Sequence, residues 1–303
     1  MQPRDLVAPF LETRFGFPRV DWPRAALAMG SEGTLSPGTK DQLVVGWLEH
    51  VVLAKGEGAR SLPGVNFHLV EVPADERAQH VLRWAEEARA FLTRNLDGIA
   101  APHASPLPLL LFTRVEDFVD WVFDHETPDA EHELASAGGV FINGPCPHIA
   151  APYGPQLEST LVHELAHALV HHLPLPAWLN EGIAVAMQWL WAPQSPAHVA
   201  SPTPFTAEDI REQRQHWNEA TIQRFWSGRA FRDPHLQRVA YPLALLLVTR
   251  LAGNYARLLR FANAAIFCDA GAAAFSTTYG EPLSQLLEPL LGRGAWQPNP
   301  ASW

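Results

Sequence analysis

Two histidines near the middle of the chain, His163 and His167, lie four positions apart in the run LVHELAHALVHH. On an α-helix this spacing puts both imidazoles on one face, one turn apart, where they can bind the same metal ion. Glu164 follows the first histidine, and its carboxylate can reach a water molecule bound to such an ion. Two histidine ligands and an adjacent glutamate base form the HExxH pattern of zinc hydrolases. The spacing therefore predicts a zinc site in which Glu164 is the general base.

The tetrapeptide HELA also begins at His132, which provides an internal comparison. In that copy the position of the second ligand is Ser136, and the surrounding DHETPDAEHE is charged and turn-like. Charge runs of this kind are typical of a solvated loop. The copy at His163 is flanked by Leu, Val and Ala, and an apolar shell suits a zinc site. We therefore assign the metal site to the second copy.

A catalytic zinc ion needs a third protein ligand and one open position. The first helix is expected to end before Leu173-Pro174, because a residue preceding proline disfavours the α conformation. A second, almost wholly apolar helix is expected to begin near Pro176, and it carries Glu181 fourteen positions after His167. A carboxylate on such a helix must be paired or bound to metal, which makes Glu181 the expected third ligand. The alternative is a helix-terminal carboxylate stabilised by the helix dipole.

The segments HELAH and LPAWLNEGIAV, joined by a short loop, resemble the gluzincin metallopeptidases. They resemble in particular the small peptidase-MA-like proteins whose second helix carries W-L-x-E-G-x-A, and the resemblance covers roughly residues 65–292. The resemblance implies a peptide or protein substrate and Glu164 as the base. It also implies one zinc ion per chain, held by His163, His167 and Glu181.

The chain departs from the thermolysin-like branch of that family at one position. That branch has an aspartate four residues after its glutamate ligand, which orients a histidine, whereas this chain has Val185. Support for a histidine must then come from another group, for which Asn180 is one possibility.

Three further positions have both a functional and a structural interpretation. Tyr241, expected at the start of an apolar helix from Pro242, would suit the oxyanion-stabilising tyrosine that the family often places in its helical lobe. The alternative is a buried tyrosine with a satisfied hydroxyl. Gly138 and Gly139 open a strand that in gluzincins is an edge pairing with extended substrate, or they mark a turn.

Two other reactive side chains are expected to lie outside the site. His171 continues the face of the two histidines, but a histidine at a helix C-terminus is favoured by the dipole alone. Cys146 is expected to be inert rather than an inhibitory thiolate. The chain has only two cysteines, Cys146 and Cys268, which argues for a reducing compartment and against a disulfide framework.

The bulk composition narrows the class of protein. The net charge of −10 argues against a nucleic-acid partner, and 47% hydrophobic residues are ample for a core. No apolar run reaches the length of a membrane span, and the N-terminus lacks the apolar region of a signal peptide. These features predict a cytoplasmic protein without a membrane span.

Alternation and helical periodicity predict an α+β fold, with a strand-containing lobe followed by a mainly helical lobe. The resemblance to gluzincins implies that the first lobe is zincin-like, with a mixed sheet and the HExxH helix. Strands are expected at VNFHLVEV, PLPLLLF (106–112), AGGVFING (137–144) and HIAA. Helices are expected at 36–58, from Pro73 to Gly98, at 115–123, in the two metal-site segments and through most of the chain after Thr206. The predicted organisation comprises a mostly helical region 1–62, a domain 63–292 made of lobes 63–192 and 205–292 around a Pro-rich hinge at 192–204, and a tail 293–303.

These observations predict a zinc-dependent hydrolase, within which a metallopeptidase is the leading interpretation. HExxH specifies the activated water but not the substrate, so a hydrolase of a non-peptide amide or ester is an alternative. An inactive binding or scaffold protein of the same fold is a further one, although a structural zinc site has no need of Glu164.

Overall fold

The computed structural model describes residues 2–56, 59–71, 77–125, 138–192 and 206–303. The chain forms two units, one made of Met1–Glu87 and His103–Leu161 and the other of Ala88–Pro102 and Val162–Trp303. Helices α4 (Arg77–Asn95) and α6 (Leu157–Val170) each contribute to both units.

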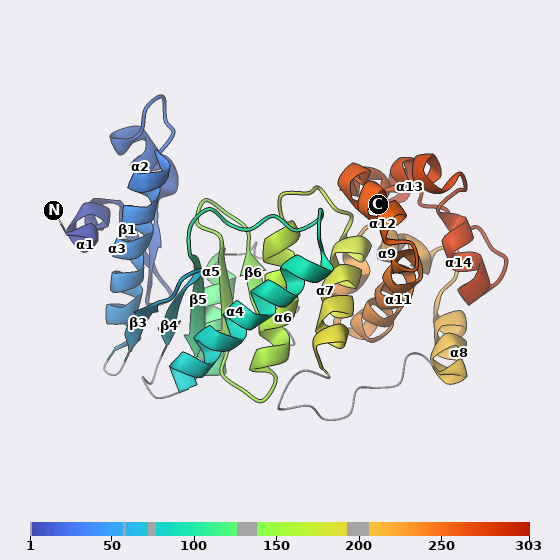
Figure 1. Cartoon of the computed structure of the whole chain (residues 1–303), viewed down its shortest axis with the longest axis horizontal. Coiled ribbons are helices and arrows are strands. Elements are labelled where there is room, and N and C mark those ends of the chain that lie inside the picture. The colour runs from blue at the N-terminus through green and yellow to red at the C-terminus, as the bar shows by residue number, and fades with distance from the viewer. Residues whose placement is uncertain (1, 57–58, 72–76, 126–137, 193–205) are drawn as a thin grey trace. The chain divides into compact units, whose positions relative to one another are not determined.

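A five-stranded mixed sheet of order β3-β4-β5-β7-β6 lies in the first unit (Figure 1). The three central strands are parallel, and both edge strands run antiparallel to their neighbours. The central β5 is buried at every position, as expected of a parallel strand covered on both faces. The sheet confirms the α+β class; its strands are β3 (Arg60–Pro63), β4 (Phe67–Glu71), β5 (Leu107–Phe112), β6 (Val140–Ile142) and β7 (His148–Pro152).

Residues 1–62 pack into the same unit and contain more than helices. The predicted helix is confirmed as α3 (Pro37–Lys55), where the Ser36 side chain accepts a hydrogen bond from the Thr39 amide and Gly56 follows the last residue. A hairpin that the sequence did not predict turns at Phe15-Gly16, where φ is +43° and +83°. The remaining elements are α1 (Pro3–Val7), η1 (Ala8–Phe10), β1 (Leu11–Arg14), β2 (Phe17–Val20) and α2 (Trp22–Met29).

The hairpin and the sheet share one core. The Phe17 ring lies edge-on to Phe112 of β5, with centroids 5.8 Å apart, and to Trp121 of α5 (Val115–His125), at 5.4 Å. Edge-to-face aromatic pairs of this kind add to the free energy gained by burial. The N-terminal residues therefore complete the core of the sheet rather than forming a core of their own.

The second unit is built from helices, and none of its described residues lies in a strand (Figure 1). The predicted apolar helix is α7, which begins one residue after Pro176 and buries Trp178 completely. The Trp178 indole stacks on Phe261 and donates to the Ala270 carbonyl at 3.0 Å, which confirms the expected burial of this helix. The helices are α7 (Ala177–Trp191), α8 (Ala207–His216), α9 (Thr221–Trp226), α10 (Arg229–Arg232), α11 (Pro234–Ala252), α12 (Tyr255–Ala264), α13 (Ala272–Tyr279) and α14 (Ser284–Leu291), with short 3-10 turns η5 (Phe267–Asp269) and η6 (Pro300–Ser302).

The apolar helix α11 corrects one expectation, because it does not start at Pro242. It begins at Pro234, where the Asp233 side chain caps the helix by accepting from the His235 amide. Pro242 lies inside the helix and has no amide hydrogen for the carbonyl four residues earlier. Tyr241 is therefore in the middle of α11 rather than at its beginning.

Some predictions fall outside the described residues. The first HELA copy lies within 126–137, and nearly all of the Pro-rich segment 192–204 lies within 193–205. The domain bounds stay a prediction. None of the helices in the described ranges combines the length and the apolar character needed to cross a bilayer.

Candidate metal centre

Helix α6 presents the two histidines of the HExxH pattern side by side. The imidazole centroids of His163 and His167 are 4.7 Å apart, and their Nε2 atoms are 3.1 Å apart. The two side chains are 15% and 12% exposed, so the pair is shielded but reachable from solvent. The helical spacing thus produces the paired imidazoles that the sequence predicts.

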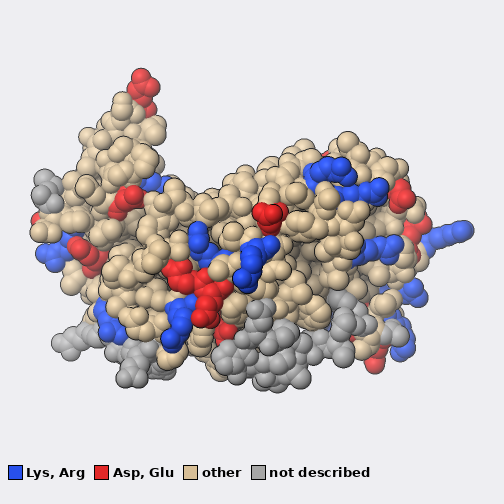
Figure 2. All heavy atoms as spheres, in the orientation of Figure 1, with Lys and Arg blue, Asp and Glu red and all other residues tan. Residues whose placement is uncertain are grey.

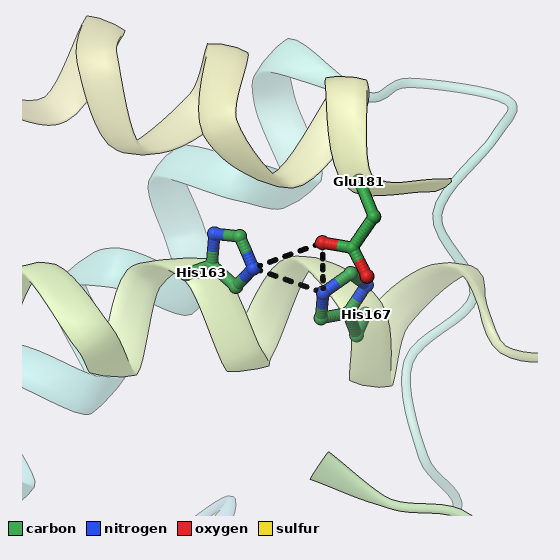
Figure 3. Close-up of side chains that lie close together, drawn as sticks. All are labelled: His163, His167 and Glu181. Atoms are coloured by element: carbon green, nitrogen blue, oxygen red, sulfur yellow. Dashed lines mark hydrogen bonds and ion pairs between the residues drawn. The ribbon is translucent and has the colours of Figure 1, made fainter. Parts of the chain in front are cut away.

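Glu181 comes from α7 and reaches the same point. Its Oε2 atom lies 3.3 Å from Nε2 of His163 and 3.4 Å from Nε2 of His167. Figure 3 shows the two imidazoles rising from one helix and the carboxylate descending toward them from the other. The reversal between α6 and α7 passes through Leu173-Pro174, as expected from the sequence.

The three ligating atoms fit a metal ion by their positions and chemistry. They lie within 4.8 Å of one another, and Oε2 of Glu181 is a buried atom without a hydrogen-bond partner of acceptable geometry. The two imidazole nitrogens lie at ion-pair distance from this oxygen, and a cation between the three atoms would add a favourable contact for each of them. Two imidazole nitrogens and one carboxylate oxygen are a ligand set of catalytic zinc sites, which keep a fourth position open.

The electrostatics of the centre also favour a positive charge. Burial alone would lower the pKa of His167, but the Glu181 carboxylate outweighs it and raises the pKa to about 9. Burial opposes ionisation of Glu181, yet the two imidazoles hold the pKa of this carboxyl well below its usual range. Both shifts show that the surroundings stabilise a positive charge beside the Glu181 carboxylate.

Asn180 supplies the support that Val185 does not. The Asn180 Oδ1 atom lies 3.1 Å from Nδ1 of His167, and because an amide oxygen only accepts, Nδ1 carries the hydrogen. The lone pair of Nε2 is then left facing His163 and Glu181. A partner on the far nitrogen is the usual means of fixing the tautomer and orientation of a metal-binding histidine.

Glu164 is buried next to the centre without being one of its three ligating groups. It is 8% exposed, and its negative charge contributes to raising the pKa of both His167 and Tyr241. Its carboxylate is therefore within electrostatic reach of His167 and of the tyrosine. This position would suit a base acting beside an ion held by the three candidate ligands.

Tyr241 lies at the centre from the α11 side. Its ring centroid is 6.3 Å from that of His163, at an interplanar angle of 67°. Burial, and then the charges of Glu181 and Glu164, raise the pKa of its hydroxyl above the usual range. The hydroxyl therefore keeps its hydrogen and can donate it in a hydrogen bond.

The other positions singled out in the sequence lie elsewhere. His171 follows the last residue of α6 and its Nδ1 lies 2.7 Å from the Ala168 carbonyl, as expected of a helix-terminal histidine. Cys146 is buried in the core of the first unit, where burial raises the pKa of the thiol to about 12. A thiol with so high a pKa is unreactive, as predicted.

Gly138 and Gly139 precede β6, which is an edge strand of the sheet. A methyl group at Gly139 would come within 2.5 Å of Cγ2 of Thr160, and one at Gly138 within 2.9 Å of its Oγ1. The two glycines are therefore needed for a close approach of the backbone to Thr160. Pairing of this edge with substrate stays a prediction.

Two residues near the centre were not predicted from the sequence. Gly182 directly follows Glu181, and the Phe231 ring lies 5.3 Å from that of Tyr241. A glycine inside an otherwise apolar helix is a signal for close packing that could have identified the first. Phe231 comes from a separate helix, and no sequence pattern connects it to Tyr241.

Comparisons with protein-family models, with curated proteins and with solved structures found no match to this chain. The likeness to gluzincins therefore depends on the residues and motifs of the chain itself.

Proposed function

We propose that this protein is a zinc-dependent hydrolase and, within that class, a metallopeptidase. The observation that supports the proposal is the convergence of two imidazole nitrogens and one carboxylate oxygen, from helices α6 and α7, around a point where the carboxylate oxygen has no hydrogen-bond partner. The three residues that would hold one zinc ion per chain are His163, His167 and Glu181.

Each neighbouring residue has a distinct part in the proposed reaction. A bound zinc ion would supply Lewis acidity and a water molecule of lowered pKa. Glu164 would accept the proton of the attacking water, since its carboxylate lies beside the ligands. Tyr241 would donate its hydroxyl hydrogen to the substrate carbonyl oxygen as negative charge develops there.

Two features favour a catalytic over a purely structural zinc site. A structural site is usually closed by four protein ligands, whereas the group found among the described residues has three. Glu164 and Tyr241 are also close to the centre without belonging to that group. A structural ion would have no use for a base and a hydroxyl donor.

The expected partners follow from the same proposal. The substrate would be a peptide or protein, an assignment that rests on the likeness to gluzincins. Acidic and basic side chains are interspersed on the face shown in Figure 2, amid large areas of other residues. The absence of a nucleic-acid partner and a cytoplasmic location stay predictions from the composition.

The test compares Glu164→Gln with the parent protein after expression in zinc-replete medium. Both proteins should contain one zinc per chain by elemental analysis, because Glu164 is not a ligand. Hydrolysis of a fluorogenic peptide library should fall by about 100-fold or more in the variant, because an amide cannot accept the proton. Glu116→Gln makes the same chemical change on a side chain of α5 that is 73% exposed, and this control should keep its activity.

The possible outcomes separate the alternatives. Sub-stoichiometric zinc in the parent, or full activity in Glu164→Gln, would overturn the proposed mechanism. Cleavage of simple amides or esters without cleavage of peptides would show the non-peptide hydrolase. Stoichiometric zinc without any hydrolysis would leave a structural site.

A further inference from the structure

Helices α7 and α11 cross with almost no space between them at Gly182. A methyl group at this position would lie 2.7 Å from the backbone oxygen of Ala244 and 2.6 Å from Cγ2 of Val248. Gly182 has ordinary helical backbone angles, so it is needed for space and not for conformation. Glycine inside a helix is destabilising relative to alanine, and the close crossing accounts for its presence.

The crossing lies next to two residues of the proposed reaction. Glu181 directly precedes Gly182 on α7, and Tyr241 is three positions before Ala244 on α11. Residues three apart on a helix lie on neighbouring parts of one face. The distance between α7 and α11 at Gly182 therefore determines the distance between the Tyr241 ring and Glu181.

Helix α11 does not fix the place of Tyr241 by itself. Pro242 gives the Arg238 carbonyl no amide hydrogen to accept, and an interior proline weakens and bends a helix at that turn. The turn that bears the tyrosine therefore depends on contacts from neighbouring helices.

Phe231 of α10 provides the second of these contacts. Its ring is buried and meets the Tyr241 ring edge-on, with centroids 5.3 Å apart. Phe231 is itself held by the Phe225 ring at 5.4 Å and by Gln237, whose Nε2 donates to the Phe231 carbonyl at 2.9 Å. Tyr241 thus lies between a fixed aromatic ring and the His163 imidazole.

We propose that Gly182 and Phe231 are positioning residues for Tyr241: the close helix crossing and the aromatic contact together hold its hydroxyl at the reacting carbonyl. This inference rests on the proposed hydrolase function. It goes beyond that function by naming two residues that are neither candidate metal ligands nor the proposed base or hydroxyl donor.

The test uses Gly182→Ala in the zinc-loaded, full-length protein. The added methyl must push α11 away, so kcat should fall toward the value of Tyr241→Phe, a loss of about 100-fold, while KM changes by only a few-fold. Zinc should stay at one per chain. Gly38→Ala adds the same methyl to helix α3, where nothing lies within 4 Å, and should leave kcat unchanged.

A double-mutant cycle shows whether Gly182 acts through the tyrosine. In a Tyr241→Phe background, Gly182→Ala should lower kcat little further, because the positioned hydroxyl is already absent. A general structural defect would lower kcat equally in both backgrounds and would overturn the proposal. Loss of zinc from Gly182→Ala would overturn it as well, by showing that the crossing positions Glu181.

A spectroscopic measurement tests the same claim without activity. With 3-fluorotyrosine incorporated at the four tyrosines, the ¹⁹F resonance of Tyr241, assigned with Tyr241→Phe, should shift in Gly182→Ala and in Phe231→Leu. The other tyrosine resonances should stay in place. An unmoved Tyr241 signal in both folded variants would contradict the proposal even if both lost activity.

Phe231→Leu keeps the inference testable if Gly182→Ala does not fold. It leaves the helix crossing intact and removes only the aromatic contact, so it should lower kcat in the parent and not in Tyr241→Phe. Equal loss in both backgrounds would contradict the role of Phe231. If Glu164→Gln remains fully active, the proposed function itself has failed, and the ¹⁹F shifts alone decide whether these residues position Tyr241.

Discussion

His148 in the first unit and His167 in the second are both largely buried, but their ring nitrogens have different partners. Nδ1 of His148 donates to the Cys146 carbonyl at 2.8 Å, and Nε2 accepts from the Trp121 indole at 3.2 Å. Nδ1 of His167 has the Asn180 oxygen, whereas Nε2 faces a second imidazole nitrogen at 3.1 Å and a carboxylate oxygen at 3.4 Å.

The difference supports a structural role for His148 and the proposed metal-binding role for His167. A neutral imidazole has one donor and one acceptor, and the surroundings of His148 match both. Nε2 of His167 faces a second imidazole nitrogen and a carboxylate oxygen, and a cation shared by the three atoms would suit this arrangement. The Glu181 carboxylate raises the pKa of His167 to about 9 against the effect of burial, so the surroundings favour a positive charge. A buried histidine nitrogen that faces other acceptor atoms is therefore a better sign of a metal site than burial of the histidine alone.

The largest expected effect is the loss of zinc when a ligand is removed. Each of His163→Ala, His167→Ala and Glu181→Ala should weaken zinc binding by more than the roughly 100-fold that removal of a supporting partner costs. Competition with a chromogenic chelator, backed by elemental analysis, measures this loss. His171→Ala is the matched control, because His171 lies just beyond the end of the same helix and its Nδ1 faces the Ala168 carbonyl. Undiminished binding in any of the three ligand variants would remove that residue from the centre.

The complementary experiment replaces His148, whose two ring nitrogens both have hydrogen-bond partners. His148→Phe keeps an aromatic ring beside Trp47 and Trp121 but removes the hydrogen bonds that the imidazole makes with the Trp121 N–H and the Cys146 carbonyl. Each lost hydrogen bond costs about 0.5–1.5 kcal/mol, so the free energy of unfolding should fall by about 1–3 kcal/mol. Zinc affinity should stay at the parent value.

Urea denaturation with and without zinc measures both quantities, and His235→Phe on the exposed start of α11 is the control. Its unfolding free energy should change by no more than about 0.5 kcal/mol. A fall in zinc affinity for His148→Phe, with its fold intact, would contradict the division between a structural and a metal-binding histidine.

The sequence predicted the parts of the fold and site that depend on short-range patterns. Strands such as β5, helices such as α3 and the HExxH face of α6 are recognisable because alternation, end signals and a four-residue spacing are local. Glu181 was predicted for an energetic reason, since an apolar helix cannot bury an unpaired carboxylate.

The features that escaped prediction depend on tertiary contacts or on ambiguous local signals. The hairpin turns at Phe15-Gly16, where the usual Asn-Gly or Asp-Gly signal of a two-residue turn is absent. The start of α11 was misplaced because Asp233-Pro234 and Tyr241-Pro242 both resemble a helix beginning. The contact between Phe231 and Tyr241 depends on where α10 packs, which no periodicity encodes.

The smallest expected effect concerns the hydrogen bond between Nδ1 of His167 and Oδ1 of Asn180. Asn180→Ala removes the acceptor that keeps the hydrogen on Nδ1, so Nε2 is no longer held ready for metal, and zinc affinity should weaken by about 10- to 100-fold. Asn180 is only half-buried, so the unfolding free energy of the zinc-free protein should change by no more than about 1 kcal/mol. Asn180→Asp restores an acceptor of similar size and should recover the parent affinity.

Competition with a chelator measures the zinc affinity of the parent, of Asn180→Ala and of Asn180→Asp. Equal affinity in the parent and in Asn180→Ala would show that the histidine is oriented by other contacts. Failure of Asn180→Asp to recover what Asn180→Ala loses would show that the amide acts through its shape, not through the acceptor that sets the tautomer. Recovery by the carboxylate would show that this chain supports its zinc ligand from the residue before Glu181, where the thermolysin-like branch uses the position of Val185.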